Sequence, residues 1–247
     1  MYAVVTGASS GLGKELAFLL AKEGYSLVLV ARREDKLKEV KIALTKYDID
    51  VKIEVLDLSV QANCFELFNR IKKLDVDLLI NNAGFGYLGL FSETDLDKEL
   101  SMLDLNIKAV QILTKLYIKN YDKGNVVNIG SSAGFLPMPR HSTYSASKAY
   151  VNRFSRAINY ELKKQKKNVR VLVVTPGPVN TEFNEVANAA INHGISANKC
   201  AREIIKGIKK RKSLIIPGFS IKLLYFFVRF IPNRILSKMA FRIQNNK

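Results

Sequence analysis

The chain has 247 residues, of which 48% are hydrophobic, and its 39 basic and 22 acidic residues give a formal net charge of +17. This length and apolar content are enough for one large domain. Cys64 and Cys200 lack CxxC or metal-ligand spacing and there are only two histidines, so the composition excludes a cysteine- or histidine-rich metal site. We expect reduced thiols in a cytoplasmic protein and no secretory signal peptide, because the first apolar run begins at Tyr2 without a basic region before it.

Apolar, β-branched runs alternate with longer helical patterns along the chain. The runs predict strands at residues 2–6, 26–31, 51–56, 77–81, 124–130, 168–175 and 213–217. The helical patterns predict helices at residues 11–24, 34–47, 61–74, 95–119, 143–165 and 197–211. Such alternation is typical of right-handed βαβ units, so we predict the α/β class, with a doubly wound parallel sheet of about seven strands and helices on both faces. No linker interrupts residues 1–217, which we expect to form one domain, followed by an apolar and basic helical extension at 218–247.

The segment from Thr6 to Gly13, with the sequence TGASSGLG, lies between the first predicted strand and the first predicted helix. A glycine-rich turn in this context presents backbone N–H groups at a helix N-terminus to the phosphates of a nucleotide. Gly7 permits the tight turn, Gly11 lets a pyrophosphate approach the backbone, and Gly13 allows the helix to pack close to the sheet. The segment therefore predicts a dinucleotide site, although by itself it also fits a turn that binds no ligand.

Tyr144 and Lys148 are four residues apart in the predicted helix 143–165, so their side chains project from the same face. A tyrosine with a pKa of roughly 10 exchanges protons poorly at neutral pH unless a nearby positive charge lowers that pKa, and Lys148 is placed to supply the charge. Such a tyrosine is a general acid/base, and the hydroxyl of Ser131 can hold a carbonyl oxygen beside it. Tyrosine and lysine at this spacing also occur as ordinary surface neighbours, so the interpretation depends on the other motifs.

These motifs, together with Asn81-Asn82-Ala83-Gly84, Asn106 and Pro176-Gly177, follow the order and approximate spacing of the short-chain dehydrogenases/reductases, which the chain resembles over about residues 1–217. The resemblance implies a Rossmann-type fold, a nicotinamide cofactor, and hydride transfer between that cofactor and a carbonyl or alcohol. It also implies catalytic roles. Tyr144 would exchange a proton with the substrate oxygen, Lys148 would lower the pKa of Tyr144 and bond the nicotinamide ribose, and Ser131 would orient the carbonyl. Asn106 would support a water-mediated proton path, with a purely structural helix asparagine as the alternative.

The same resemblance implies further contacts with the cofactor. Asp57 and Leu58 would lie by the adenine, with a helix N-cap as the alternative for Asp57. The segment Pro176 to Thr181 would hold the carboxamide. The expected cofactor-binding residues are Gly7, Ser9, Ser10, Gly11, Leu12, Gly13, Arg32, Arg33, Asp57, Leu58, Asn82, Ala83, Gly84, Tyr144, Lys148, Pro176, Gly177, Val179 and Thr181.

The end of the second predicted strand bears on the choice of cofactor. A dinucleotide fold selective for NAD places an acidic residue there, whereas this chain has Ala31-Arg32-Arg33. Guanidinium groups form bidentate, charge-assisted hydrogen bonds with phosphate. We therefore expect Arg32, with Arg33 and Ser9, to favour the 2′-phosphate of NADP over NAD.

Apolar residues dominate the segments where the substrate is expected, including the variable substrate loop of the family at residues 182–196. Candidates to line the pocket are Phe85, Tyr87, Leu88, Phe91, Phe135, Leu136, Met138, His141, Phe183, Val186, Ile191 and Ile195. An apolar pocket suits a lipophilic ketone, aldehyde, acyl thioester or steroid-like molecule better than a sugar. The same residues can equally belong to the core.

The chain continues past the last predicted strand with the apolar run Phe219 to Ile231, then Pro232 and a basic stretch. The run is interrupted by Lys222 and Arg229, and Pro217-Gly218 and Pro232 bracket only about fourteen residues, too few to span a bilayer. It can cover the pocket, pack against a second subunit, or lie in a membrane interface.

Lysine-rich clusters at residues 163–167 and 209–212 lie at predicted helix C-termini, where cations complement the helix dipole. We interpret them as solvated faces, with attraction to an anionic membrane or an acyl carrier as the second interpretation. Nucleic acid is disfavoured, because no recognition motif accompanies the clusters.

The leading hypothesis is an NADP-dependent reductase of a lipophilic carbonyl, cytoplasmic or peripheral to a membrane. The resemblance implies a homodimer or homotetramer formed through the helices at about 95–119 and 143–165. A non-catalytic NADP sensor or scaffold on the same fold is the alternative.

Overall fold

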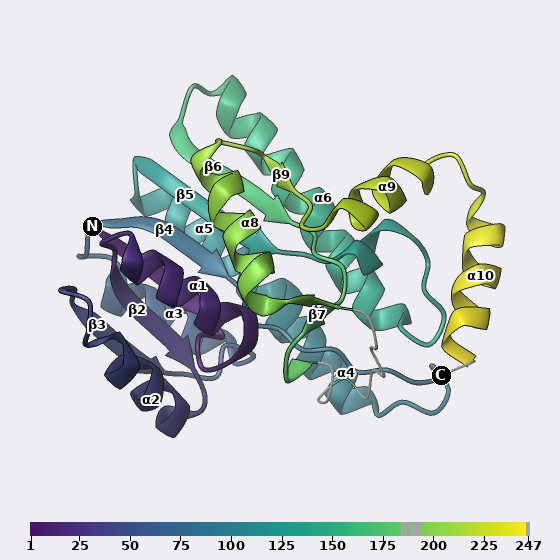
Figure 1. Cartoon of the computed structure of the whole chain (residues 1–247), viewed down its shortest axis with the longest axis horizontal. Coiled ribbons are helices and arrows are strands. Elements are labelled where there is room, and N and C mark those ends of the chain that lie inside the picture. The colour runs from purple at the N-terminus through teal and green to yellow at the C-terminus, as the bar shows by residue number, and fades with distance from the viewer. Residues whose placement is uncertain (184–186, 188–193, 246–247) are drawn as a thin grey trace.

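A seven-stranded parallel sheet forms the centre of the protein (Figure 1). The computed structural model describes residues 1–183, 187 and 194–245. The strands are β1 (Tyr2–Thr6), β2 (Ser26–Ala31), β3 (Val51–Val55), β4 (Val76–Asn81), β5 (Lys123–Ile129), β6 (Asn168–Val174) and β9 (Leu214–Ile215). Their order is β3-β2-β1-β4-β5-β6-β9, so the winding reverses between β1 and β4. A doubly wound sheet binds ligands outside the carboxyl ends of its strands at such a reversal. The predicted fold class is confirmed.

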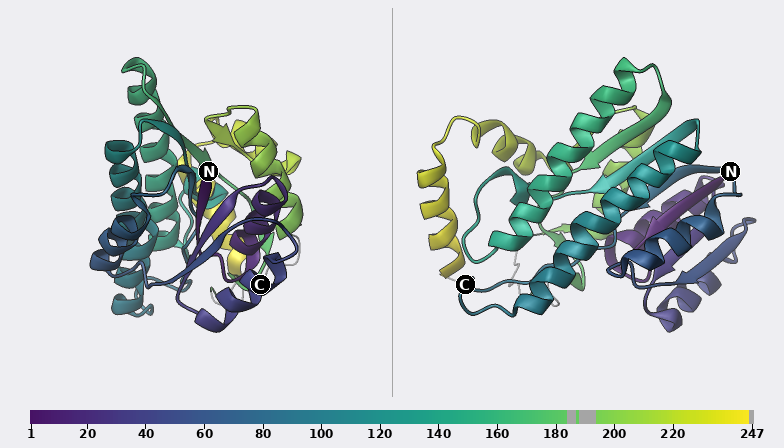
Figure 2. Two further views of the ribbon diagram at one scale, coloured as in Figure 1. Left: turned by 90° about the vertical axis from the view of Figure 1, so that its left-hand side faces the viewer. Right: turned by 180° about the vertical axis from the view of Figure 1, so that it is seen from behind.

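Helices cover both faces of the sheet, as Figures 1 and 2 show. One face carries α1 (Gly11–Lys22), α2 (Glu34–Leu44) and α8 (Ala197–Lys209), whose apolar residues share one buried cluster with the strands. The other face carries α3 (Gln61–Ile71), α5 (Val110–Asn120) and α6 (Ser142–Lys164). Most of the predicted helices end two or three residues later than the helices of the structure, because fraying ends retain a helical pattern.

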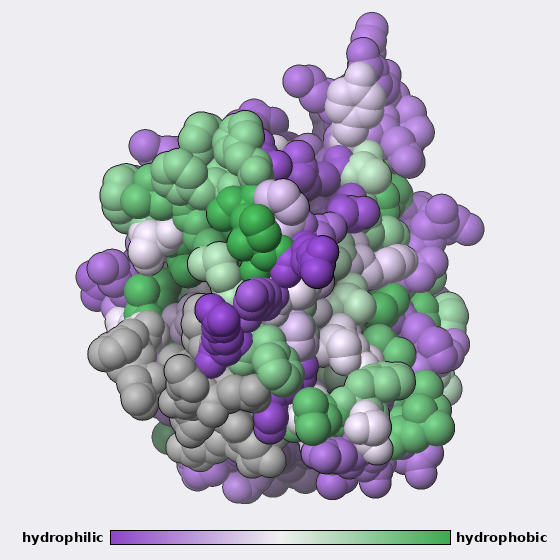
Figure 3. Space-filling model, turned by 90° about the vertical axis from the view of Figure 1, so that its right-hand side faces the viewer, coloured by the Kyte–Doolittle hydropathy of each residue, from purple (hydrophilic) through white to green (hydrophobic). Residues whose placement is uncertain are grey.

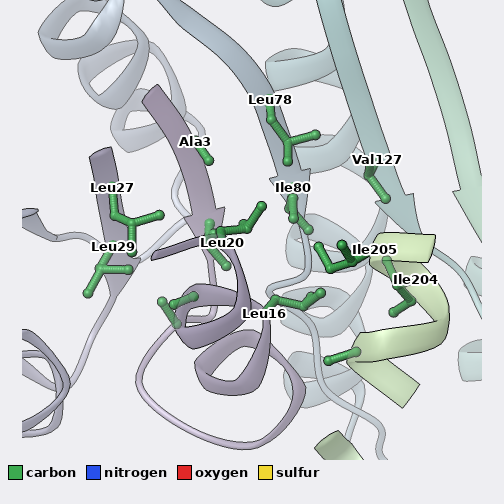
Figure 4. Packing of buried hydrophobic residues seen from close by; sticks show 14 of the residues in the cluster. Ala3, Leu16, Leu20, Leu27, Leu29, Leu78, Ile80, Val127, Ile204 and Ile205 are labelled. Atoms are coloured by element: carbon green, nitrogen blue, oxygen red, sulfur yellow. The ribbon is translucent and has the colours of Figure 1, made fainter. Parts of the chain in front are cut away.

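The strand residues are apolar without alternation because both faces of the sheet are buried. In β1, Val5 joins the cluster under α1 and α8, whereas its neighbour Val4 joins the cluster on the opposite face, and both are fully buried. Figure 4 shows Leu16 and Leu20 of α1 directed at the sheet beside Ile204 of α8. This packing fixes the start of α1, and therefore the glycine-rich turn, against the end of β1.

The prediction of one continuous helix at 95–119 is wrong, because a π-helical segment interrupts it. The structure has α4 (Leu96–Leu103), the π-helical segment η1 (Asp104–Ala109) and α5 in its place. Asn106, fully buried in η1, uses its side chain to bond the main chain of Phe85 in another segment. The wider π turn accommodates a side chain that is held by partners outside its own helix, and π segments frequently occur at functional sites.

Short elements follow β6 that the sequence did not predict. The two-residue strands β7 (Val179–Asn180) and β8 (Ile195–Ser196) pair in parallel, and they join the two ends of the predicted substrate loop. The short β9 replaces the longer strand predicted at 213–217, since Pro217-Gly218 leads directly into the next helix.

The C-terminal extension forms two helices, α9 (Phe219–Phe227) and α10 (Asn233–Asn245), at the right of Figure 1. The α9 helix packs on η2 (Ser132–Phe135), where the rings of Phe135 and Tyr225 have centroids 4.7 Å apart. In the part of the chain that the structure describes, no helix is long and apolar enough to cross a membrane.

Candidate active site

A cavity of about 700 Å³ lies where the segments that follow β1 to β6 converge. Every predicted cofactor-binding or catalytic residue lines it except Gly13 and Asn106. Residues separated by more than 170 positions in the sequence, from Gly7 to Thr181, therefore form the walls of one cavity.

The glycine-rich turn has the backbone that a phosphate site requires. Gly7 and Gly11 have φ angles of 67° and 52°, in the left-handed region that side chains other than glycine rarely adopt. A Cβ atom at Gly13 would collide with the carbonyl oxygen of Gly7 and with the side chain of Asn82. Gly13 therefore serves close packing, as predicted, although it does not line the cavity.

Hydrogen bonds join the carboxyl ends of β1 and β4. The hydroxyl of Thr6 accepts from the main-chain N–H groups of Asn82 and Ala83, both at 2.9 Å. The side-chain amide of Asn82 donates in return to the carbonyl of Thr6 at 2.9 Å. These bonds hold the glycine-rich turn beside the Asn82-Ala83-Gly84 segment, so both lie on the same side of the cavity.

The two arginines after β2 lie at the cavity wall and have different partners. The Arg32 guanidinium lies 3.5 Å from the carboxylate of Asp57. Arg33 donates to the hydroxyl of Ser10 and to the carboxylate of Glu182, both at 2.9 Å. Its contact with the hydroxyl of Ser9 is longer, at 3.3 Å. The Arg32 and Arg33 side chains are 68% and 47% exposed, so an anion in the cavity can reach both positive charges.

Asp57 is held in its charged form. Burial acts against the carboxylate, but hydrogen bonds from the N–H and hydroxyl of Ser59 and the charge of Arg32 outweigh it, and the pKa of Asp57 is lowered. The alternative in which Asp57 caps α3 is wrong, because the N-cap residue of that helix is Val60.

The predicted catalytic side chains come from two adjacent elements. Ser131 lies two residues after the end of β5, and Tyr144 and Lys148 lie in the first turns of α6. Tyr144 is hydrogen-bonded to Ser131. The ammonium of Lys148 lies 5.8 Å from the centroid of the Tyr144 ring and donates to the carbonyl of Ile129 at 3.1 Å. The three predicted groups thus meet at the cavity wall.

Burial dominates the pKa values of this pair. It raises the pKa of Tyr144 to about 12, against a smaller lowering by the hydrogen bond to Ser131. Burial also lowers the pKa of Lys148 to about 8. Burial outweighs any lowering of the Tyr144 pKa by Lys148, whose ammonium donates to a main-chain carbonyl, so the predicted effect of the lysine on the phenol stays a prediction.

Asn106 lies behind the cavity wall. Its side chain accepts from the N–H of Phe85 at 3.2 Å and donates to the carbonyl of the same residue at 2.9 Å. It also donates to the hydroxyl of Ser147 on α6 at 3.2 Å. These bonds tie the loop after β4 to the catalytic helix, which supports a positioning role.

The apolar candidates for the substrate pocket divide into three groups. Phe85, Leu88, Leu136, Met138, His141 and Phe183 line the cavity, whereas Tyr87, Phe91, Phe135 and Ile195 do not. Val186 and Ile191 lie outside the described residues. The ring of Phe183 lies 5.8 Å from that of Tyr144, centroid to centroid, so the wall beside the phenol is apolar.

Part of the cavity wall comes from residues that the sequence analysis did not name. The α9 and α10 helices contribute Ile221, Leu224, Leu236, Met239 and Ala240. Their spacing of three or four residues within each helix is the available signal. The same signal also fits a subunit or membrane contact, so it did not identify these residues as cavity lining.

Among the described residues, no group of three or more His, Cys, Asp or Glu side chains is arranged to hold a metal ion. Cys64 and Cys200 are buried, and desolvation raises the pKa of each thiol to about 12. Both cysteines are therefore packing residues of the core.

Comparison with known proteins agrees with this arrangement. The family model described as short chain dehydrogenase matches residues 1–192. The very-long-chain 3-oxoacyl-CoA reductase of Anas platyrhynchos is 34% identical over 200 residues, which are 77% of this chain and 64% of that protein. The chain thus spans less than two thirds of the length of this relative.

Two solved structures have the same fold. A short-chain dehydrogenase from Sphingobium yanoikuyae in complex with NADPH superposes with a TM-score of 0.82 at 28% identity, covering 88% of each chain. The bulky-bulky ketone specific alcohol dehydrogenase from Comamonas testosteroni gives a TM-score of 0.79 at 27% identity, covering 88% of this chain and 86% of that one. A doubly wound sheet with a glycine-rich turn at its switch point defines the Rossmann-type class. Within that class, the chain belongs to the short-chain dehydrogenase/reductase family.

Proposed function

We propose that the protein is an NADP(H)-dependent oxidoreductase that transfers hydride between the cofactor and the carbonyl of a lipophilic ketone, aldehyde or acyl thioester. One observation carries this proposal. The glycine-rich turn, the arginine pair and the Ser131, Tyr144 and Lys148 side chains line the same cavity. A nucleotide held by the turn would therefore extend toward the tyrosine.

The residues of the cavity fit the parts of NADP. The left-handed glycines and the N-terminus of α1 suit the pyrophosphate. Arg32 and Arg33 suit the 2′-phosphate, because exposed guanidinium groups bond phosphate with charge assistance. Bound NADPH would supply the hydride, and the other steps belong to the protein.

The proton chemistry follows from the environment of Tyr144. Burial keeps the Tyr144 phenol protonated at neutral pH, which is the form that donates, and the charge of Lys148 would have to lower its pKa of about 12 for efficient proton transfer. Ser131 would hold the substrate oxygen beside it, and the phenol O–H bond would break as the proton passes to that oxygen. The Lys148 ammonium is close enough to stabilise the phenolate that remains.

The substrate class follows from the far end of the cavity. Phe85, Leu136, Met138 and Phe183 line the cavity together with residues of α9 and α10, and the ring of Phe183 lies beside Tyr144. Such a wall contributes binding energy through apolar contact and offers few partners for sugar hydroxyls. A relative named for a very-long-chain 3-oxoacyl-CoA and a structural neighbour named for bulky ketones fit the same class.

The alternative is an NADP sensor or scaffold without turnover. The hydrogen-bonded Ser131 and Tyr144 beside a buried lysine favour the enzyme, because a binding protein has no need of a proton donor in the cavity.

The homodimer or homotetramer and the cytoplasmic location are also part of this proposal.

The deciding experiment titrates the protein with NADPH and NADH by fluorescence, then follows NADPH oxidation with lipophilic aldehydes, ketones and acyl thioesters. Tyr144→Phe should lose turnover by about a hundredfold or more while retaining NADPH binding. Tyr160→Phe is the matched control, since Tyr160 is 62% exposed and does not line the cavity. Failure to bind either cofactor contradicts the proposal, and binding with no turnover on any substrate favours the sensor.

A further inference from the structure

The outer side of α9 and the turn after it expose large aromatic side chains. Phe219, Phe226, Phe227 and Phe230 are 74%, 55%, 54% and 71% exposed, and we call this group the C-terminal apolar face. The ring of Phe226 contacts the rings of Phe227 and Phe230, with centroids 5.4 and 5.5 Å apart. Figure 3 shows apolar side chains gathered on this end of the molecule, with hydrophilic side chains beside them. A contiguous exposed group of this kind marks an interaction surface.

The charged residues of α9, α10 and the turn between them are all positive, although Lys222 lies 3.8 Å from the carboxylate of Glu203 on α8. Lys222 and Arg229 flank the C-terminal apolar face, and the neighbouring α10 carries Arg234, Lys238 and Arg242. No aspartate or glutamate follows Glu203 in the sequence. Aromatic side chains next to Lys and Arg are typical of helices that lie in the headgroup region of an anionic bilayer.

A second copy of the chain fits this surface less well. A twofold dimer would place the same patch on both sides of the contact. The basic residues of one copy would then face those of the other without an acidic partner from this segment. An anionic lipid surface supplies the missing negative charge, and helices of 9 and 13 residues are suited to lying in its interface.

The same helices connect this surface to the cavity. Leu224 and Met239 line the cavity, yet they are 39% and 50% exposed. Ile221 and Leu236 line it from the same two helices, and Leu236 is nearly buried. The helices that carry the C-terminal apolar face and its basic neighbours therefore also line the substrate end of the cavity.

We propose that α9 and α10 dock the protein on an anionic phospholipid bilayer and that a lipophilic substrate passes from the bilayer into the cavity between these helices. The docking depends only on the exposed aromatic and basic residues. The entry route rests on the function proposed above.

The test is co-sedimentation of the full chain with vesicles of phosphatidylcholine, alone or mixed with phosphatidylserine. We expect binding to the mixed vesicles and weak binding to phosphatidylcholine alone. The combined variant Phe226→Ser, Phe227→Ser and Phe230→Ser should weaken binding by about tenfold or more. The variant Phe65→Ser is its control, since Phe65 is an exposed aromatic residue of α3 and should leave binding unchanged.

A second variant tests the charges. Replacing Arg234, Lys238 and Arg242 by glutamine should weaken binding by about a hundredfold, since each basic residue near an anionic surface contributes about fivefold. The same replacement of Lys163, Lys164 and Lys166, exposed at the end of α6, should have little effect. Thermal unfolding of each variant establishes that it is folded.

Three results would overturn the proposal. The first is no binding to the mixed vesicles. The second is an equal loss of vesicle binding in the α10 variant and in the lysine variant at the end of α6. The third is binding that the phenylalanine variant does not change. Loss of self-association in the phenylalanine variant without any vesicle binding would identify a subunit contact instead. Vesicle binding is scored without cofactor or substrate, so failure of the proposed reaction would be seen separately as absent turnover.

Discussion

Lys148 is only 6% exposed, and burial lowers its pKa from 10.5 to about 8. Its pKa in the unfolded chain is the ordinary one, so folding releases a proton between pH 8 and pH 10.5. Lys148 therefore opposes folding fully below about pH 8. The penalty disappears as the pH rises toward 10.5.

Replacing Lys148 by methionine should consequently make the protein more stable at pH 7, by about 3 kcal/mol at most. The advantage should shrink progressively between pH 8 and pH 10. Urea unfolding of both proteins at several pH values measures the difference in stability. The titration of Tyr144 is common to both proteins, and its stabilising effect is lost only as the pH rises above 10. Lys72→Met on the surface is the control. A variant that is less stable at pH 7, or a difference independent of pH, would contradict this account.

Arg33 joins the glycine-rich turn to Glu182, the first residue of the predicted substrate loop. If the 2′-phosphate of NADP binds this guanidinium, the Glu182 carboxylate competes with it. Glu182→Gln should then tighten NADPH binding by about two- to fivefold, the range of a surface ion pair, and leave NADH binding unchanged. Fluorescence titration measures both, with the exposed Glu39→Gln as the control. An equal change for the two cofactors would show that Arg33 does not contact the 2′-phosphate.

The order of strands and helices could be predicted because burial on one or both faces leaves a periodic pattern in the sequence. The π-helical segment η1 could not, since its cause is a set of bonds between Asn106 and Phe85, residues 21 positions apart. The paired strands β7 and β8 have two residues each, too few to show a period. The site residues that belong to compact motifs could be predicted, because each motif fixes its own backbone and side chains without bonds to distant segments.

The importance of η1 can be measured through Asn106. Its replacement by alanine leaves the N–H and carbonyl of Phe85 without their side-chain partner, at a cost of about 2 to 4 kcal/mol. For a chain of this size the melting temperature should fall by about 5 to 15 °C. Asn120→Ala is the control, because the Asn120 side chain is exposed and bonds a carbonyl of its own helix. Equal melting of the two variants would show that η1 does not depend on Asn106.

At the scale of the whole molecule, the two ends of the chain enclose one cavity. The glycine-rich turn after β1 and the arginines after β2 form a polar and positively charged end of the cavity, and α9 and α10 form an apolar end. The first could be predicted because glycines and arginines have few structural alternatives at these positions. The second could not, because an apolar stripe on a helix is the same whether it covers a cavity, a subunit or a lipid.

Leu236 tests whether α10 forms the far wall of the substrate site. It lines the cavity and is 5% exposed, so Leu236→Asn places an amide against any long apolar substrate. Displacing apolar contact with a buried polar group costs about 1 to 3 kcal/mol, which lowers kcat/KM for long-chain 3-oxoacyl thioesters by about ten- to a hundredfold. Short-chain thioesters, which end before this wall, should keep their kcat/KM, and NADPH binding should not change.

Val228→Thr is the control for Leu236→Asn, since Val228 is buried in the same C-terminal extension but does not line the cavity. The readout is kcat/KM across a series of acyl chain lengths. An equal loss at every length would mean that the variant disturbs the fold rather than the wall. No loss at any length would mean that the substrate does not extend to α10, and that the apolar end of the cavity serves another ligand.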